Sequence, residues 1–154
     1  MRTKLLLLLF IPVLTSCQNY HQNIAIEEEV ATFDYSDFSD LKIEWKNLFS
    51  PAKSHYFVYI YSISCGHCNR IKEDVLTYIS ANKEMFYLIE YSNEIATKSN
   101  VAETIGKEKI EEISILGTPT LLAVTNWSLS LNIAGEKEIV DYLNGLPHKE
   151  KCSN

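Results

Sequence analysis

Two cysteines three positions apart carry the clearest chemical signal in this 154-residue chain. Cys65 and Cys68 enclose Gly66 and His67 and come directly after a long apolar run, residues 55–63. If a helix begins there, both thiols lie on one face of its first turn, close enough to form a disulfide. The unpaired N–H groups at a helix start favour the thiolate, which is the species that attacks disulfides. The pattern predicts a redox-active dithiol, in which imidazolium character at His67 further stabilises the Cys65 anion.

Other uses of a Cys-x-x-Cys pattern fit this chain less well. Half of a zinc site has the same spacing, but His21, His55 and His148 form no second ligand pair with a nearby cysteine. A permanent structural disulfide spanning two residues would constrain little of the unfolded chain. The sequence therefore predicts no metal, and no cofactor beyond the Cys65–Cys68 disulfide itself.

The beginning of the chain has the pattern of an export signal. Arg2 and Lys4 precede an apolar run of ten residues, 5–14. As a helix this run would extend about 15 Å, half of a bilayer core of about 30 Å. It therefore predicts a signal peptide rather than a transmembrane span.

The residues that follow, Leu14-Thr15-Ser16-Cys17, resemble a bacterial lipobox, in which the cysteine becomes the lipidated first residue. An ordinary secretory signal with a chance cysteine is the alternative. We predict a signal peptide over 1–16, lipidation of Cys17 with a flexible tether over 17–29, a folded domain over 30–147 and a charged tail over 148–154. The domain would be anchored at the extracytoplasmic face of the cell membrane, where disulfides form and persist.

The charge of the chain limits its partners. The net charge is −6, and removal of Arg2 and Lys4 leaves 12 basic residues against 20 acidic ones, a net charge of −8. Such a surface argues against binding nucleic acid, and it leaves membrane attachment to the acyl chains on Cys17.

The domain reads as alternating strands and helices in the order βαβαβ(α)ββα. Asp37 and Ser39 are possible N-caps of a first helix, which Pro51 ends. The first half of the domain is predicted as strand 30–33, a helix with Phe38, Leu41, Trp45 and Leu48 at helical spacing, strand 55–63, and a helix that buries Cys68, Ile71, Val75 and Ile79. The second half is predicted as strand 85–91, a helix within 101–110, strand 121–124, a turn at Asn126-Trp127, and a strand with Leu129, Leu131 and Ile133. A last helix is predicted from Gly135 to about Leu146, with Ile139, Val140 and Leu143 facing inward.

A second motif completes a resemblance. Gly117-Thr118-Pro119-Thr120 stands immediately before a predicted strand, and Ser64-Cys65-Gly66-His67-Cys68 stands after one. Together they resemble the thioredoxin superfamily, and Cys-Gly-His-Cys is the form typical of protein disulfide isomerases. The resemblance covers residues 30–146 and implies an α/β, thioredoxin-like fold with a central mixed sheet flanked by helices.

The resemblance also implies roles for individual residues. Cys65 would be the nucleophile and Cys68 the buried resolving thiol, with His67 tuning the pair. Pro119 would be a cis proline that faces the dithiol and lacks an N–H of its own. The substrate would contact the residues beside these groups, namely Ser64, Gly66 and Thr118.

Three features depart from the family pattern. Many relatives have a buried carboxylate six residues before the first cysteine, which accepts the proton of the resolving thiol. Here that position is Tyr59, and a neutral tyrosine is no base at ordinary pH. Ser64 replaces a frequent aromatic residue, and residues 91–110 form a longer stretch than a minimal thioredoxin has.

These observations favour a thiol–disulfide oxidoreductase that acts on exported proteins as an oxidase or isomerase. One alternative is a reductase of the same fold, fed by a membrane redox partner. Another is a thioredoxin-like accessory lipoprotein for peptide export or metal delivery. Cys152, in the charged tail, is either an accidental free thiol or a partner for pairing in trans.

Overall fold

A computed structural model describes residues 32–146 of the chain. The predicted signal peptide, Cys17, the tether and the charged tail with Cys152 lie outside these residues. Within 32–146, no helix is long and apolar enough to cross a membrane. The elements are η1 (Tyr35–Leu41), η2 (Trp45–Asn47), β1 (His55–Tyr61), α1 (Gly66–Ala81), η3 (Lys83–Met85), β2 (Phe86–Glu90), η4 (Ala102–Thr104), η5 (Ile110–Glu112), β3 (Thr120–Thr125), β4 (Ser128–Ala134) and α2 (Glu136–Gly145), where η marks a 3₁₀ helix.

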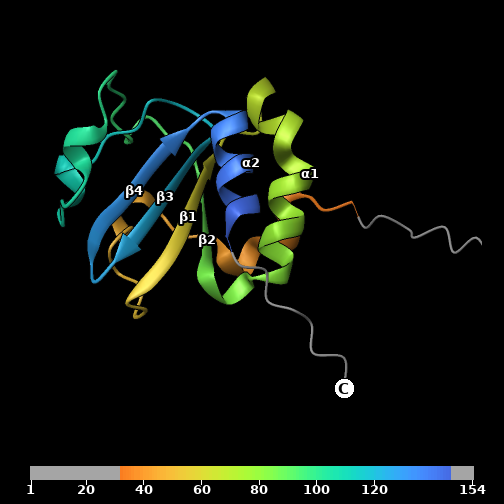
Figure 1. Ribbon diagram of the computed structural model, residues 1–154, viewed down its shortest axis with the longest axis horizontal. Helices are drawn as coiled ribbons and strands as arrows, with labels where there is room; N and C mark the ends of the chain where they lie inside the picture. The colour runs from red at the N-terminus through yellow and green to blue at the C-terminus, as the bar shows by residue number, and fades with distance from the viewer. Residues whose placement is uncertain (1–31, 147–154) are drawn as a thin grey trace, which may run out of the picture. The chain divides into compact units, whose positions relative to one another are not determined.

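The strands form one mixed sheet in the order β2-β1-β3-β4 (Figure 1). β1 pairs with β2 in parallel, and helix α1 makes the crossover between them. β3 is antiparallel to both β1 and β4. This is the expected α/β, thioredoxin-like arrangement of a mixed sheet with helices.

Helices α1 and α2 cover one face of the sheet, side by side (Figure 1). The predicted apolar stripe of α1 is confirmed, because Cys68, Ile71, Val75 and Ile79 are all buried. These side chains pack with those of β1 that point to the same face, and α2 adds two buried residues. The β1 and α2 members of this cluster are Phe57, Tyr59, Tyr61, Ile139 and Leu143.

The opposite face of the sheet has its own apolar cluster, which explains why β1 is apolar at nearly every position. Tyr56, Val58 and Ile60 alternate with the residues that face α1 and are fully buried. Their cover comes from η2 and from the stretch between β2 and β3 rather than from an α-helix. The covering residues are Trp45, Leu48, Ile95, Ile113 and Ile115.

The predicted helix through Phe38 and Leu48 is wrong. Two 3₁₀ helices replace it, and the chain between them forms a parallel bridge from Lys42 to Leu88 of β2. Phe38 belongs to the cluster under α1, whereas Leu48 belongs to the cluster on the other face. A single straight helix cannot pack against both faces of the sheet, so this segment bends around the edge formed by β2.

The predicted N-caps of that first helix are also wrong. The N-cap of η1 is Asp34, whose side chain accepts a hydrogen bond from the backbone of Tyr35. Asp37 completes a capping box by accepting a bond from the Asp34 backbone N–H at 2.8 Å. Asp37 therefore contributes to the cap as its third residue, and Ser39 lies inside the helix.

Two further elements differ from the prediction. Residues 32 and 33 belong to no strand, and 30–31 lie outside the described residues, so the described sheet has four strands where five were expected. The helix expected within 101–110 is a single 3₁₀ turn, Ala102–Thr104. Gly106 then adopts φ +83° and donates its N–H to Leu129 O at 2.7 Å, which turns the chain onto the edge of β4.

Candidate redox site

The dithiol lies where β1 ends and α1 begins. Cys65 is the N-cap residue of α1, and its Sγ accepts a hydrogen bond from the Cys68 N–H at 3.3 Å. Both cysteines are free thiols, with Cys65 partly exposed and Cys68 fully buried. The Cys65 thiol is therefore accessible and the Cys68 thiol is not, as expected of an attacking and a resolving thiol.

The loop before β3 lies against the dithiol. The Thr118–Pro119 peptide bond is cis, and the Cys65 thiol donates to Thr118 O at 3.2 Å. Thr120 steadies the loop by donating from its hydroxyl to Gly117 O at 2.6 Å. The structure therefore brings Cys65, Thr118 and Pro119 together from positions more than fifty residues apart in the sequence.

The two thiols have opposite pKa shifts. Partial burial acts to raise the pKa of Cys65, but hydrogen bonding by the side chains of Thr118 and Cys68 and by the backbone N–H groups of Cys68 and His67 lowers it. Burial raises the pKa of Cys68 to about 11, and the neighbouring Cys65 adds to the effect. At neutral pH the thiolate forms at Cys65 in preference to Cys68, as the helix-start argument predicts.

An ion-pair cluster holds His67. Its Nδ1 lies 2.5 Å from Oε1 of Glu136, the first residue of α2, and Arg70 donates to the same carboxylate at 2.7 Å and 3.0 Å. The same Nδ1 lies 2.8 Å from the Arg70 guanidinium, so His67, Arg70 and Glu136 contact one another. Hydrogen bonding by Arg70, and to a smaller extent by His67, lowers the pKa of Glu136 to about 2. This carboxylate is therefore ionised at any ordinary pH.

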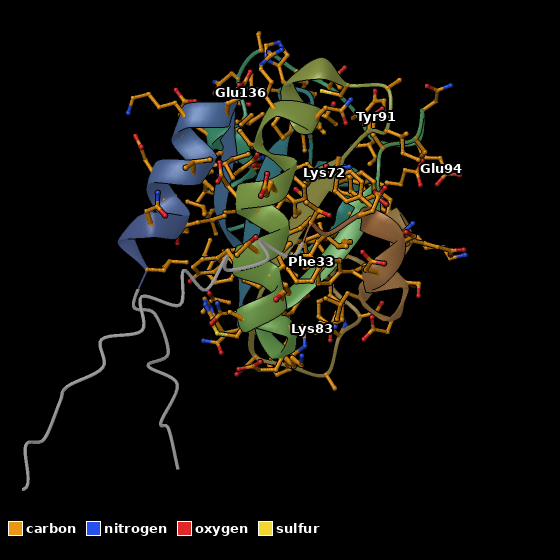
Figure 2. The ribbon with its side chains drawn as sticks, turned by 90° about the vertical axis from the view of Figure 1, so that its right-hand side faces the viewer. Phe33, Lys72, Lys83, Tyr91, Glu94 and Glu136 are labelled. Carbon is orange, nitrogen blue, oxygen red and sulfur yellow. The ribbon has the colours of Figure 1, made fainter. Side chains whose placement is uncertain are left out.

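Sequence reasoning did not find Glu136 or Arg70. Both helices begin at the same end of the sheet, and Figure 2 shows Glu136 at that end, far from Lys83 at the other. The only signal was the acidic first turn of a helix that follows Gly135. His67 and Glu136 are 69 positions apart in the sequence, so no local pattern shows that they meet.

The remaining predicted contact residues are accessible to solvent. Ser64, Gly66 and His67 are exposed on the loop and first turn of α1. Two apolar side chains beside the motifs were missed by the sequence reasoning. Ile63 and Leu116 are 63% and 49% exposed, and they precede the dithiol and the Pro119 loop respectively. Both are exposed apolar side chains that adjoin the two motifs in the sequence.

The position of the family's buried carboxylate is occupied by a buried phenol. Tyr59 is fully buried and belongs to the same cluster as Cys68. Burial raises the pKa of Tyr59 well above its usual value near 10. Tyr59 therefore stays neutral and cannot take up a proton as a base.

Within 32–146 no group of three or more His, Cys, Asp or Glu side chains could hold a metal ion.

Comparisons with known proteins find solved structures with a similar fold. No protein-family model and no curated protein matches the chain. Thioredoxin f2 of Chlamydomonas reinhardtii is 12% identical with a TM-score of 0.44, over 68% of this chain and 93% of that one. Mitochondrial thioredoxin 3 of Saccharomyces cerevisiae is 14% identical with a TM-score of 0.42, over the same shares.

A third similar structure was solved in work on the thiol resolving mechanism of yeast mitochondrial 1-Cys peroxiredoxin via the glutathione and thioredoxin systems. The matched chain of that structure is 13% identical with a TM-score of 0.40, over 73% of this chain and 91% of that one. The thioredoxin-like class of the present chain is defined by its own sheet order, its two helices and the Pro119 loop that faces the dithiol.

Proposed function

We propose that this protein is an extracytoplasmic thiol–disulfide oxidoreductase that exchanges disulfides with exported proteins through Cys65 and Cys68. One observation carries the proposal. The Cys65 Sγ lies at the start of α1, 3.3 Å from the Cys68 backbone nitrogen and 3.2 Å from Thr118 O. An accessible thiol of lowered pKa thus stands beside a buried partner and a loop that could position a substrate.

The exchange proceeds in two substitutions at sulfur when the protein acts as an oxidant. A substrate thiolate attacks Cys65 in the Cys65–Cys68 disulfide, and Cys68 leaves with the electron pair as a thiolate. A second substrate thiolate then attacks the sulfur of the substrate in this mixed disulfide, and Cys65 leaves. The substrate gains a disulfide, and the two cysteines end as a reduced pair that takes up two protons.

The surroundings of the dithiol favour this direction. The lowered pKa of Cys65 makes it a good leaving group, and stabilisation of the reduced form raises the reduction potential. His67, held by Glu136 and Arg70, lies in the first turn of α1 between the two cysteines. An oxidase or isomerase uses such a potential, whereas a thioredoxin-like reductase needs a lower one.

The location of the protein is also a proposal. The Leu14–Cys17 pattern supports attachment to the cell membrane through lipid on Cys17, with 17–29 as a tether. Exported proteins would be its substrates, and a membrane redox partner would restore its disulfide. A Cys17→Ser chain that still fractionated with membranes after a salt wash would contradict lipid anchoring.

The reduction potential of the Cys65–Cys68 pair tests the proposed direction. The chain with Cys17→Ser and Cys152→Ser, so that two thiols remain, is equilibrated against glutathione buffers of defined ratio. We expect a potential nearer to that of protein disulfide isomerase, about −180 mV, than to that of thioredoxin, about −270 mV. A value at the thioredoxin end would instead assign the protein as a reductase, and a pair that never cycles would favour an accessory role.

A further inference from the structure

Arg70 of α1 and Glu136 of α2 form an ion pair at the end of the molecule that carries the dithiol. Arg70 Nε lies 3.0 Å from each carboxylate oxygen of Glu136, and Nη2 lies 2.7 Å from Oε1. Several donors of one guanidinium on one carboxylate fix its orientation, which a lysine ammonium cannot do. The pair joins residues 66 positions apart, so the guanidinium is held in one place by the fold.

The guanidinium lies over the two residues that separate the cysteines. Arg70 comes one turn after Gly66, and side chains of a helix lean towards its N-terminus. Nη2 lies 2.8 Å from Nδ1 of His67, and Nη1 lies 3.7 Å from the position that a Cβ on Gly66 would occupy. The positive charge therefore lies against the first turn of α1, next to Cys65.

A second set of contacts brings the start of α2 to the same site. The Gly135 N–H, one residue before Glu136, donates to Pro119 O at 3.2 Å. The Cys65 thiol donates to Thr118 O, also at 3.2 Å. The start of α2 and the Cys65 thiol thus contact adjacent residues of one loop. The ion pair and the loop contact are independent, and both place Glu136 beside the dithiol.

The charges of the pair act on Cys65 with opposite signs, and the positive one lies closer to the turn. The guanidinium lies against Gly66, whereas Glu136 contacts α1 through the side chains of Arg70 and His67. Hydrogen bonding to Glu136, and to a smaller extent a negative charge on Cys65, raises the pKa of Arg70. Attraction between Arg70 and the Cys65 thiolate is mutual, so Arg70 stabilises that thiolate in return.

We propose that Arg70, positioned by Glu136, supplies a permanent positive charge that stabilises the Cys65 thiolate and thereby favours the reduced dithiol. This inference rests on the proposed exchange function and names the residue that adjusts its direction. The sequence assigned the tuning of the pair to His67, whose imidazole is positive only when protonated. A guanidinium is charged at every ordinary pH, so the contribution of Arg70 does not depend on the protonation of His67.

The charge acts in the step that releases the oxidised substrate. In the mixed disulfide, the second substrate thiolate forms a bond to the substrate sulfur, and the bond from that sulfur to Cys65 breaks. The electron pair of the broken bond passes to Cys65, where negative charge develops beside the guanidinium. Neither Arg70 nor Glu136 gains or loses a proton. Glu136 is a positioning residue, since it acts on Cys65 through Arg70.

Arg70→Gln in the Cys17→Ser, Cys152→Ser chain tests the role of the charge. The ultraviolet absorbance of the thiolate, followed against pH in the reduced protein, gives the acid dissociation constant of Cys65, the first thiol to ionise. We expect this constant to fall about threefold, the size typical of charges that are partly exposed. The difference should shrink as salt is raised. A structural role of Arg70 would not give this salt dependence.

The equilibrium with glutathione measures the consequence for the redox reaction. At pH 8 the Arg70→Gln dithiol should be easier to oxidise than the parent dithiol, because its reduced form has lost the stabilising charge. The titratable side chains of β1 and η1 near Cys65, Tyr59 and Tyr35, are the same in every chain compared. Arg70 and Glu136 are 57% and 29% exposed, so neither substitution removes buried packing.

The matched control is Lys83→Gln, which changes the net charge by the same amount. Figure 2 shows Lys83 at the other end of the molecule from Glu136, and its Nζ lies 5.0 Å from the centre of the Phe38 ring. It should leave the acid dissociation constant of Cys65 unchanged. An equal fall in Lys83→Gln, or no fall in Arg70→Gln, overturns the proposed role of Arg70.

A double-mutant cycle with Glu136→Gln tests the positioning. Charges that stay in place contribute additively, so an Arg70 that kept its position without Glu136 would matter equally in both backgrounds. We expect the effect of Arg70→Gln to drop below about 1.5-fold in the Glu136→Gln chain, because the released guanidinium moves into solvent. Equal effects in the two backgrounds overturn the positioning role of Glu136.

Failure of this inference is distinguishable from failure of the proposed function. A parent dithiol that does not exchange with glutathione contradicts the exchange function itself. A parent dithiol that exchanges, while Arg70→Gln leaves both the acid dissociation constant of Cys65 and the glutathione equilibrium unchanged, overturns only the role of Arg70.

Discussion

At the scale of single residues, the chemistry depends on the different surroundings of two cysteines in the first turn of α1. Cys65 stands at the helix start, where N–H groups face its sulfur, and Cys68 lies one turn further, in the apolar cluster. The lowered pKa of the first thiol and the raised pKa of the second follow from these positions. The position of Cys65 at a helix start predicted its stabilised thiolate, because that depends on local helix geometry. The burial of Cys68 was predicted from the apolar stripe of the same helix and from the family resemblance.

The asymmetry predicts selective alkylation. In the Cys17→Ser, Cys152→Ser chain, iodoacetamide should modify Cys65 alone in the folded protein. The pH midpoint of its rate should fall below that of free glutathione measured in parallel, because the thiolate is stabilised. Modification of Cys68 at a similar rate, or a midpoint equal to that of glutathione, would contradict the assignment.

The Glu136 carboxylate gives a second prediction at this scale. Its pKa is lowered to about 2, so the ion pairs with Arg70 and His67 stabilise the fold fully above the unfolded value near 4.5. This contribution is lost as the pH falls from about 4.5 towards 2.

Thermal unfolding of Glu136→Gln against the parent chain measures that contribution. We expect a small destabilisation at pH 7 that shrinks as the pH is lowered to 3 and as salt is raised, since the Arg70 and His67 partners are largely exposed. Glu138→Gln, on the same helix, is the control and should show no such trend. A difference that stayed constant between pH 7 and pH 3 would contradict the ion-pair account.

At the scale of elements, the sequence predicts best what depends on one segment alone. The α1 stripe, the doubly buried β1 and the Asn126-Trp127 turn are confirmed, because periodicity and turn residues act locally. The segments 38–48 and 101–110 were misjudged for a common reason. Their apolar spacing suits a helix, but their course is set by the sheet edges that they must cover, at Leu88 and Leu129.

The turn between β3 and β4 supports a stability prediction. Asn126 and Trp127 have φ of 51° and 62°, a left-handed conformation that glycine adopts without strain and tryptophan does not. Trp127 is 52% exposed, so its ring is only partly packed. We expect Trp127→Gly to be more stable than Trp127→Ala by about 1 kcal/mol, after allowance for the entropy of glycine.

Urea unfolding provides the measurement, with Trp127→Ala as the matched control. Alanine removes the same ring but keeps the Cβ that makes the left-handed conformation unfavourable. It should therefore give no gain in stability. Equal effects of the two substitutions would show that the ring, and not the backbone, determines the stability of this turn.

At the scale of the whole molecule, the fold brings three distant segments to one end of the sheet. The dithiol at the start of α1, the Thr118–Pro119 loop and Glu136 at the start of α2 meet there. The two motifs were sufficient to predict the first two members of this site. Glu136 and Arg70 could not be predicted, since their contacts exist only once the chain is folded.

Capture of substrates by the resolving-thiol variant tests the central claim most directly. In the full-length chain with Cys68→Ser, Cys65 can still attack, but the mixed disulfide cannot be resolved. We predict disulfide-linked adducts with exported proteins, which disappear on reduction and are absent when Cys65→Ser is added to the same chain. If Cys68→Ser forms no adducts beyond those of the double variant, the protein does not act through thiol–disulfide exchange at Cys65.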